Sequence, residues 1–447
     1  MPEIPHERRA LANGLRIILA PDARAPIVAV NLWYAVGSRN ERPGRTGFAH
    51  LFEHMMFQGS AKVEKGQHFA LIQAVGGTLN ATTWLDRTNY FETLPSHELE
   101  LALWLEADRM GGLLPAMTQD KLDNQRDVVK NERRWSVDNQ PYGDWDERIQ
   151  ALAFPEGHPY HHPTIGSMED LSAASLDDVR EFFATWYAPN NAVLTIAGDF
   201  EPDRAMEMVE RHFGPIPANG QLPAAPATDI EPLIGREVRE TVPAAVPLPR
   251  IYLAYRAPVF GSERFDALDV TADLLGSGRA SRLYASLVRE KRLAQDVTVF
   301  LFPLTGGAAL LAAWATARPG VAVERLEAEL FGEIERLAQD GPSDAELERV
   351  RTLHAAAVTG LLERVSERAD RLSMYACLFD APERVGGEID RYDAVDAARV
   401  REAATAALVA DNRVVLTYLP AEAPLALGAE RDETAPPIAA VDAEEER

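Results

Sequence analysis

An internal repeat is the feature of this sequence that most limits its possible folds. The segment APNNAVLT at 188–195 is echoed by ADNRVVLT at 410–417. The offset, 417 minus 195, is 222 residues, close to half of the 447-residue chain. Both halves also follow the order strand, long helices, final strand, so the sequence predicts a duplicated unit. Chance similarity over eight residues is the alternative.

The spacing of apolar residues predicts the fold class of each unit. Strand signals occur early in the first half and again between its helices, at 15–19, 27–35 and 78–94. Apolar residues three to four apart predict helices at 46–58, 67–75, 96–110 and 118–138. This order predicts an α+β fold of two similar domains, each with helices packed on a mainly antiparallel sheet.

Proline content and charge set the expected domain boundaries. Prolines recur between Pro215 and Pro249, which excludes one continuous helix or central strand there. The end of the chain is acidic and carries prolines, as in disordered tails. We therefore expect an N-terminal domain, a proline-rich linker, a C-terminal domain and a disordered tail, at 1–220, 221–249, 250–425 and 426–447.

Composition excludes some partners. The chain has 45 lysine and arginine residues against 69 aspartate and glutamate residues, a formal charge of −24. Nucleic acids and anionic membranes bind through excess positive charge, so neither is expected as a partner. The longest weakly polar run, 305–317, is too short to span a bilayer. The single cysteine, Cys377, excludes an intrachain disulfide framework and leaves the compartment open.

The order His50-x-x-Glu53-His54 predicts a metal site. Thr46 is a suitable start for a helix and Gly59 a suitable end, so the motif is expected on a helix. Residues four apart lie on one helix face, where both imidazoles can bind one ion. Glu53 lies on the same side and can face a water on the metal without being a ligand.

Catalytic zinc usually has three protein ligands and one open position. Glu132, on the predicted helix 118–138, is the best candidate for the third ligand, but spacing alone does not select it among many carboxylates. The alternative is an amphipathic helix with two ordinary histidines, on which Met55 and Met56 pack into a core. A buried Glu53 without a partner is costly, which weakens that alternative.

The motif is the inverzincin signature, and the chain resembles the pitrilysin family of zinc metallopeptidases, which includes insulin-degrading enzyme and the mitochondrial processing peptidase. The resemblance covers nearly the entire chain. The segments that carry it are 44–59, 76–83, 128–132, 157–160 and 187–191.

The resemblance implies that His50, His54 and Glu132 are ligands of one Zn²⁺ and that Glu53 is the general base. It implies that each chain forms half of a clamshell chamber that admits short or unfolded peptides. It also implies that the strand carrying Asn80, Ala81 and Thr82 binds extended substrates by main-chain hydrogen bonds.

The sequence departs from the family pattern at two places. Gln125 stands where the family often has a second glutamate that supports the metal site, so the hydrogen bonds around the metal are expected to differ. The family's substrate-binding arginine is present as Arg289, but the tyrosine seven residues later is replaced by Asp296, beside Gln295. We therefore expect a zinc-bearing subunit of a heterodimer, with a related partner supplying the arginine and tyrosine.

Other interpretations stay open. The loop with His158, His161 and His162 invites a second metal site, but its proline-rich setting favours an ordinary loop. A noncatalytic subunit of the same fold is the main functional alternative, and a different metal-dependent hydrolase is a third. No signal-peptide pattern is visible at the start. Resemblance to bacterial relatives favours a periplasmic location, with the cytoplasm as the alternative.

Overall fold

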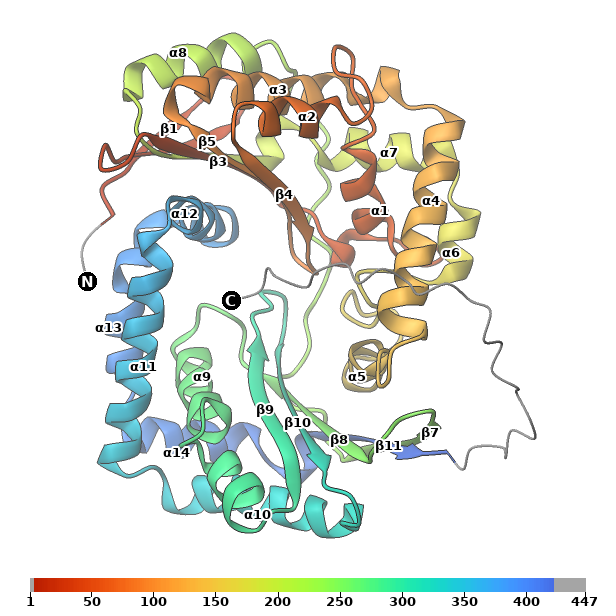
Figure 1. Ribbon diagram of the computed structural model, residues 1–447, viewed down its shortest axis with the longest axis vertical. Helices are drawn as coiled ribbons and strands as arrows, with labels where there is room; N and C mark the ends of the chain where they lie inside the picture. The colour runs from red at the N-terminus through yellow and green to blue at the C-terminus, as the bar shows by residue number, and fades with distance from the viewer. Residues whose placement is uncertain (1–3, 422–447) are drawn as a thin grey trace, which may run out of the picture.

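The computed structural model describes residues 4–421 and contains two mixed sheets, each covered by helices (Figure 1). The tail expected at 426–447 lies outside the described residues. The first sheet has the strand order β1-β2-β6-β3-β5-β4. Its strands are β1 Glu7–Ala10, β2 Arg16–Pro21, β3 Ile27–Tyr34, β4 Thr78–Thr83, β5 Thr88–Pro95 and β6 Ala192–Gly198.

The second sheet repeats the topology of the first. Its order is β7-β11-β8-β10-β9, which matches β2-β6-β3-β5-β4 strand for strand. In both sheets one pair is parallel, β2 with β6 and β7 with β11, and the other matched pairs are antiparallel. The strands are β7 Val238–Ala244, β8 Arg250–Ala257, β9 Ala294–Phe302, β10 Ala309–Ala317 and β11 Arg413–Pro420. The predicted fold of two similar α+β domains is confirmed.

The repeated segment has the same local structure in both halves. A short turn, Pro189–Asn191 or Ala410–Asn412, leads directly into the strand β6 or β11. The side-chain amide of Asn191 donates to the Trp186 carbonyl at 2.8 Å, and that of Asn412 donates to the Ala407 carbonyl at 2.8 Å. Each asparagine thus ties the end of the preceding helix to the start of its strand.

The helices lie between and around the strands. The first half contains α1 Phe48–Met55, α2 Gln67–Ala74, α3 Leu99–Ala116, α4 Gln119–Arg133, α5 Trp145–Ala153, α6 Met168–Ala173, α7 Leu176–Trp186 and α8 Pro202–Phe213. The second half contains α9 Glu263–Gly276, α10 Val323–Asp340, α11 Asp344–Glu363, α12 Val365–Phe379, α13 Glu388–Asp393 and α14 Ala397–Ala407. Two π-helical segments follow α4 and α9, at Arg134–Asp138 and Tyr284–Glu290.

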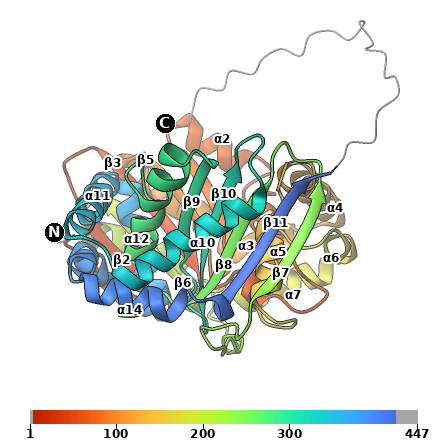
Figure 2. The same ribbon diagram turned by 90° about the horizontal axis from the view of Figure 1, so that it is seen from below.

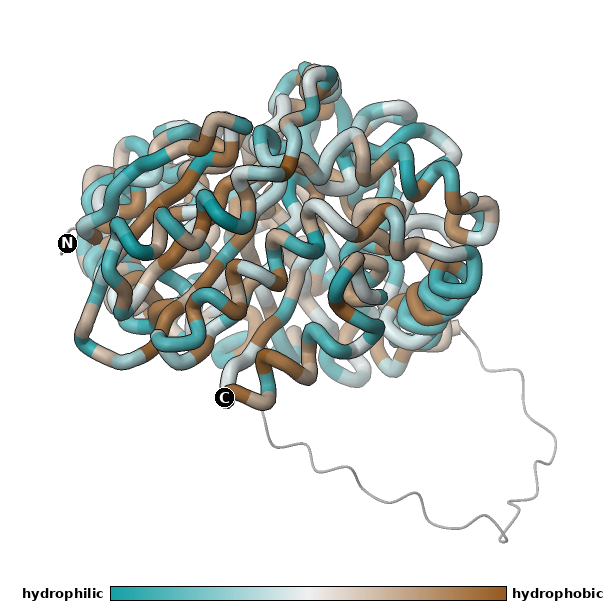
Figure 3. The backbone as a smooth tube through the Cα atoms, turned by 90° about the horizontal axis from the view of Figure 1, so that it is seen from above, coloured by the Kyte–Doolittle hydropathy of each residue, from teal (hydrophilic) through white to brown (hydrophobic). Residues whose placement is uncertain are grey.

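The surface helices form because their apolar residues recur at helical spacing. In α8, Ala205, Met208, Val209 and Phe213 are buried while the charged residues between them are exposed. Figure 3 shows this alternation of hydrophilic and hydrophobic residues along the outer helices. Among the described residues, no helix is both long and apolar enough to cross a membrane.

The two halves exchange helices. Helix α12 belongs to the second half but packs on β3 and β6 of the first sheet, where Ala369, Leu372 and Ala376 join a buried cluster with Ile18 and Val193. Helix α5 belongs to the first half but packs on β8 and β11 of the second sheet. The opposite face of the second sheet is covered by α10 and α14 (Figure 2). Each sheet therefore has one face covered by the other half of the chain.

The region 221–249 contains regular structure. Strand β7 lies within it and pairs with β11 at the edge of the second sheet. Pro243 fits there because an edge strand can lack one backbone donor. The start of the second sheet therefore falls inside this proline-rich segment.

Candidate metal centre

Helix α1 presents one apolar face and one polar face. Its buried residues Phe48, Leu51, Phe52 and Met55 point into the first core, where Phe52 packs on Phe183 and Tyr187. His50, Glu53 and His54 lie away from that apolar face, because positions 50, 53 and 54 share one side of a helix. Helix α1 also contacts both α4 and β4. The sequence motif is therefore placed between the third candidate ligand and an edge strand.

The three candidate ligands meet at one point. The Nε2 atoms of His50 and His54 are 3.3 Å apart. Glu132 lies on α4 and places Oε1 3.6 Å from Nε2 of His50 and Oε2 3.3 Å from Nε2 of His54. The structure thus brings together the two histidines and the one carboxylate that the sequence analysis selected.

This arrangement fits a tetrahedral zinc ion. Ligand atoms about 2.0–2.1 Å from a tetrahedral ion are about 3.3–3.4 Å from one another. The 3.3 Å between the two Nε2 atoms matches that value, and the imidazoles lie 3.6 and 3.3 Å from the two different oxygens of Glu132. Two imidazoles and one carboxylate leave a fourth position open, as in catalytic zinc sites. Glu132 is 39 % exposed, so solvent reaches the site from its side.

The electrostatics of the group also suit a cation. Burial lowers the pKa of His50 to about 4, although the charge of Glu132 opposes the shift. The imidazole is therefore neutral at pH 7, which is the form that binds metals. The hydrogen bond from His54 is the main cause that lowers the pKa of Glu132, so this carboxylate is charged and ready to bind.

Glu53 lies on α1 beside the candidate ligands His50 and His54. Burial raises its pKa, while a hydrogen bond from Thr83 and the nearby positive charges oppose the shift. A carboxylate with a raised pKa is a better proton acceptor near neutral pH. Glu53 is not one of the three residues whose ligand atoms converge. It can therefore take a proton at the site without being a metal ligand.

The strand β4 forms the free edge of the first sheet next to this group. Asn80, Ala81 and Thr82 all lie on it, and within residues 4–421 only one of its sides is paired, with β5. The Ala81 amide donates to the side-chain Oδ1 of Asn80 at 2.9 Å. Strand β4 therefore has an unpaired edge to which an extended peptide can add as a further strand.

Arg87 was missed by the sequence analysis. It follows β4 in the turn to β5 and donates through Nη1 to the Thr82 carbonyl at 2.9 Å and to Oδ1 of Asn89 at 3.0 Å. Its guanidinium lies over the Trp33 ring at 5.1 Å, and burial lowers its pKa. One arginine thus fixes the end of the edge strand. No spacing rule distinguishes it from the other arginines of the sequence.

Three further positions from the sequence analysis lie apart from the ligand group. Gln125 is buried on α4 and donates its amide to Asn124 at 3.0 Å. Arg289 is exposed near the end of the π-helical segment Tyr284–Glu290 and forms an ion pair with its neighbour Glu290 at 3.2 Å. Asp296 on β9 accepts hydrogen bonds from Trp314 and Thr316, both at 3.1 Å. The position expected to carry a tyrosine therefore holds a carboxylate tied to its own sheet.

The histidines of the 158–162 loop do not converge. The ring of His158 contacts the Thr228 carbonyl at 3.3 Å, and His161 bonds the Phe154 carbonyl at 2.8 Å. His162 bonds Glu41 at 2.9 Å. Among the described residues these three rings do not form a common metal group.

A second convergent group, which the sequence did not reveal, is buried in the first core. His68 on α2, Glu92 on β5 and Glu106 on α3 bring ligand-type atoms within 4.8 Å of one another. Arg109 forms an ion pair with Glu106 and lies over the Tyr90 ring at 4.1 Å. The guanidinium already supplies a positive charge here, so this group is an internal ion-pair network rather than a second metal centre.

Gly47 offers a test of how tightly the start of α1 is held. Its φ is +84°, and an added Cβ would lie 2.7 Å from the Ile165 carbonyl oxygen. Gly44 has a similar φ of +76° but open space around it. We expect Gly44→Ala to cost about 1–2 kcal/mol from backbone strain alone. Gly47→Ala is expected to cost at least about 1 kcal/mol more, because the neighbouring loop must move. Denaturant unfolding measures both losses, and equal losses would show that the loop yields freely.

The comparisons with known proteins agree with this geometry. Residues 16–155 match the family described as Insulinase (Peptidase family M16), and residues 173–353 match the Peptidase M16 inactive domain. The zinc protease PqqE of Helicobacter pylori is 32% identical over 383 residues, which cover 83% of each chain.

Solved structures show the same fold. The crystal structure of a protease from Helicobacter pylori superposes with a TM-score of 0.87, at 28% identity, over 93% of this chain and 100% of that one. The periplasmic protease PqqL of Escherichia coli superposes with a TM-score of 0.75, at 18% identity, over 94% of this chain but only 48% of its own. The chain described here is thus about half as long as PqqL.

Proposed function

Because the chain belongs to the insulinase family of peptidases, family M16, we propose that it is a zinc endopeptidase that hydrolyses peptides or unfolded small proteins. The observation that carries this proposal is the convergence of His50, His54 and Glu132 at the spacing of tetrahedral zinc ligands. Glu53 stands beside them with a raised pKa, in the position of a base.

Zinc held by these three residues would polarise the scissile carbonyl and lower the pKa of a water at the site to about 7. The protein's own groups do the remaining work. The edge of β4 orients an extended substrate by main-chain hydrogen bonds, which selects conformation more than sequence. Glu53 takes a proton from the attacking water and passes it to the leaving amine.

We propose further that the active form is a heterodimer. Arg289 is exposed and paired with Glu290, and Asp296 occupies the place of the family's tyrosine. Loss of a donor to the developing oxyanion costs about 3–4 kcal/mol, so a lone chain would be a poor catalyst. A related chain that carries the arginine and tyrosine would complete the chamber. The match of this chain to about half of PqqL supports such a pairing of two units.

The second candidate function is a noncatalytic subunit. The match of 173–353 to a domain described as inactive favours it. The ligand group in the first half favours catalysis instead, because nothing in a structural subunit requires two imidazoles and a carboxylate 3.3–3.6 Å apart. A periplasmic location is proposed from the bacterial relatives, one of which is described as a periplasmic protease. Cell fractionation tests it.

The decisive experiment measures zinc content and cleavage of a quenched peptide together. We expect one zinc per chain, slow cleavage by the chain alone, and faster cleavage after co-purification with a related chain that carries the arginine and tyrosine. A chelator should abolish cleavage and added zinc should restore it. Full activity of the isolated chain would contradict the proposal that the active form is a heterodimer. Zinc binding without cleavage in any combination would favour the noncatalytic subunit.

A further inference from the structure

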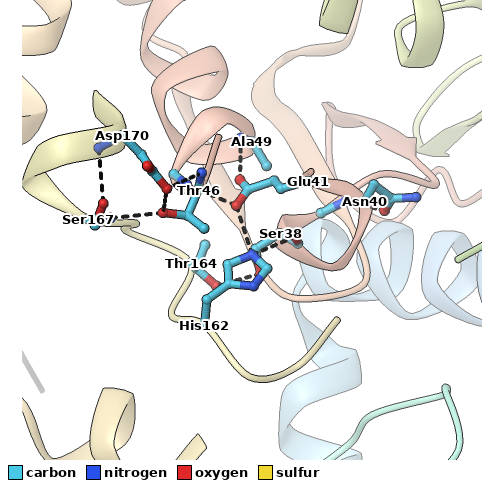
Figure 4. Close-up of polar contacts among 11 residues, drawn as sticks. Ser38, Asn40, Glu41, Thr46, Ala49, His162, Thr164, Ser167 and Asp170 are labelled. Carbon is cyan, nitrogen blue, oxygen red and sulfur yellow. Dashed lines mark hydrogen bonds and ion pairs between the residues drawn. The ribbon is translucent and has the colours of Figure 1, made fainter. Parts of the chain in front are cut away.

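The metal-binding helix has no side-chain cap of its own. The N-cap residue of α1 is Gly47, which has no side chain to accept the free amides of the first turn. Glu41, from the loop before the helix, accepts them instead: Oε2 accepts from the Gly47 amide at 2.9 Å and Oε1 from the Ala49 amide at 2.8 Å. Ala49 directly precedes the candidate ligand His50. A carboxylate from outside the helix therefore bonds to the first turn of α1 (Figure 4), the turn that contains His50.

The Glu41 side chain is fully buried, and His162 is its side-chain partner. Nε2 of His162 donates to Oε2 of Glu41 at 2.9 Å and also contacts the Ser38 carbonyl at 3.0 Å (Figure 4). Burial raises the pKa of Glu41. Burial alone would lower the pKa of His162, but the bond to Glu41 and its charge outweigh burial and raise it. His162, one of the three loop histidines named in the sequence analysis, is thus the partner of Glu41, which caps α1.

The segment that follows His162 also holds the helix of the third ligand. The Gly166 carbonyl accepts a hydrogen bond from Arg133, the neighbour of Glu132 on α4, at 2.9 Å. On the other side, Asp170 accepts from the Thr46 amide at 2.9 Å and from its hydroxyl at 2.6 Å. The segment 162–170 therefore forms hydrogen bonds with both the start of α1 and the end of α4. These are the two helices whose separation sets the distances between the three ligands.

We propose that Glu41 and His162 are positioning residues of the metal centre, which hold the first turn of α1 against the 162–170 segment and so set the imidazoles against Glu132. This inference rests on the proposed zinc site but adds residues that neither the motif nor the ligand set contains. Neither residue touches the ligand atoms, so each acts through the backbone of α1. Loss of such outer hydrogen bonds typically weakens metal affinity or activity about 10–100-fold.

The test compares Glu41→Gln with a matched variant in the second half. Glutamine keeps the size of the side chain, but its amide nitrogen cannot accept the second backbone hydrogen bond. Glu346 serves as the control because it caps α11 through the Ser343 amide at 2.8 Å and pairs with Arg282 at 2.6 Å, far along the chain from the metal group. Zinc affinity of the full chain is measured against a chelator, and the visible spectrum is recorded with Co²⁺ in place of zinc.

We expect Glu41→Gln to weaken zinc affinity about 10–100-fold and to shift the Co²⁺ bands, whereas Glu346→Gln lowers the melting temperature and changes neither. His162→Leu should also weaken zinc affinity, because it removes the donor to Glu41. His162→Gln keeps a donor and should therefore retain more of the zinc affinity. Wild-type affinity and spectrum in Glu41→Gln would overturn the inference, as would an equal loss in Glu346→Gln.

The same measurements separate this inference from the proposed function. A wild-type chain that binds no zinc would overturn both. A chain that binds zinc but cleaves no peptide would overturn the proposed peptidase alone, because the effect of Glu41 and His162 is read from zinc affinity and the Co²⁺ spectrum. A failure of Glu41→Gln to change either, in a chain that binds zinc and cleaves peptides, would overturn the positioning role alone. If Glu41→Gln does not fold, the comparison of His162→Gln with His162→Leu decides the outcome.

Discussion

Glu53→Gln is expected to lower kcat by about 10²–10⁴-fold while leaving zinc bound. The reason is that glutamine keeps the shape of the side chain but cannot accept a proton from water. Zinc should remain because Glu53 is not among the three converging ligands. Steady-state cleavage of a quenched peptide and zinc analysis of the same sample measure the two effects, in the presence of the partner chain if one is needed.

The exposed Glu64 provides the control for this substitution, since Glu64→Gln makes the same chemical change away from the ligands. It should leave both zinc content and turnover unaltered. Normal turnover in Glu53→Gln would mean that another group is the base. Loss of zinc in that variant would mean that Glu53 takes part in holding the ion, and its assigned role would then have to change.

Arg109→Met is expected to destabilise the chain by about 3–5 kcal/mol without touching the metal group. Arg109 and Glu106 are 1 % and 0 % exposed, so removal of the guanidinium leaves a carboxylate uncompensated inside the core. Burial already raises the pKa of Glu106 to about 8, although the charge of Arg109 opposes the shift. Urea unfolding above pH 8, where Glu106 of the intact pair is ionised, measures the loss of stability.

The double variant Glu106→Gln with Arg109→Met isolates the ion pair. Replacing both members of a buried pair is often close to neutral, so most of the lost stability should return. The sign of the pH dependence gives a second check. The folded pKa of Glu106 lies above its ordinary value of 4.5, so the stability from its bound proton is present below about pH 4.5 and falls as pH rises through about 8. Glu106→Gln should flatten that slope. An equal loss in the single and double variants would show that packing, not charge, explains the effect.

The sequence predicted those parts of the molecule that depend on local spacing. The helix of the HxxEH motif was expected at 46–58 and is found at Phe48–Met55, because three-to-four spacing is a property of neighbouring residues. The repeat at offset 222 predicted the matched topology of the two sheets for the same reason: similar segments fold into similar units.

The remaining features depend on contacts between distant residues. Glu41 caps a helix that begins at Phe48, and His162 reaches it from a loop 121 positions along the chain. The group of His68, Glu92 and Glu106 comes from three separate elements. No periodicity links such positions, so only the folded chain reveals them. The family resemblance selected Glu132 where spacing could not, because it relates a distant position to the motif directly.

The exchange of α12 and α5 between the halves has a consequence for how a polypeptide enters. Separating the halves would expose an apolar sheet face on each side and break the hydrogen bonds from Asn31, Trp33 and Asn89 to Asp370. We therefore expect the two halves of this chain to stay fixed relative to each other. In the heterodimer proposed above, the opening that admits a substrate would therefore lie between the two chains, and the rate of entry would depend on how tightly they associate.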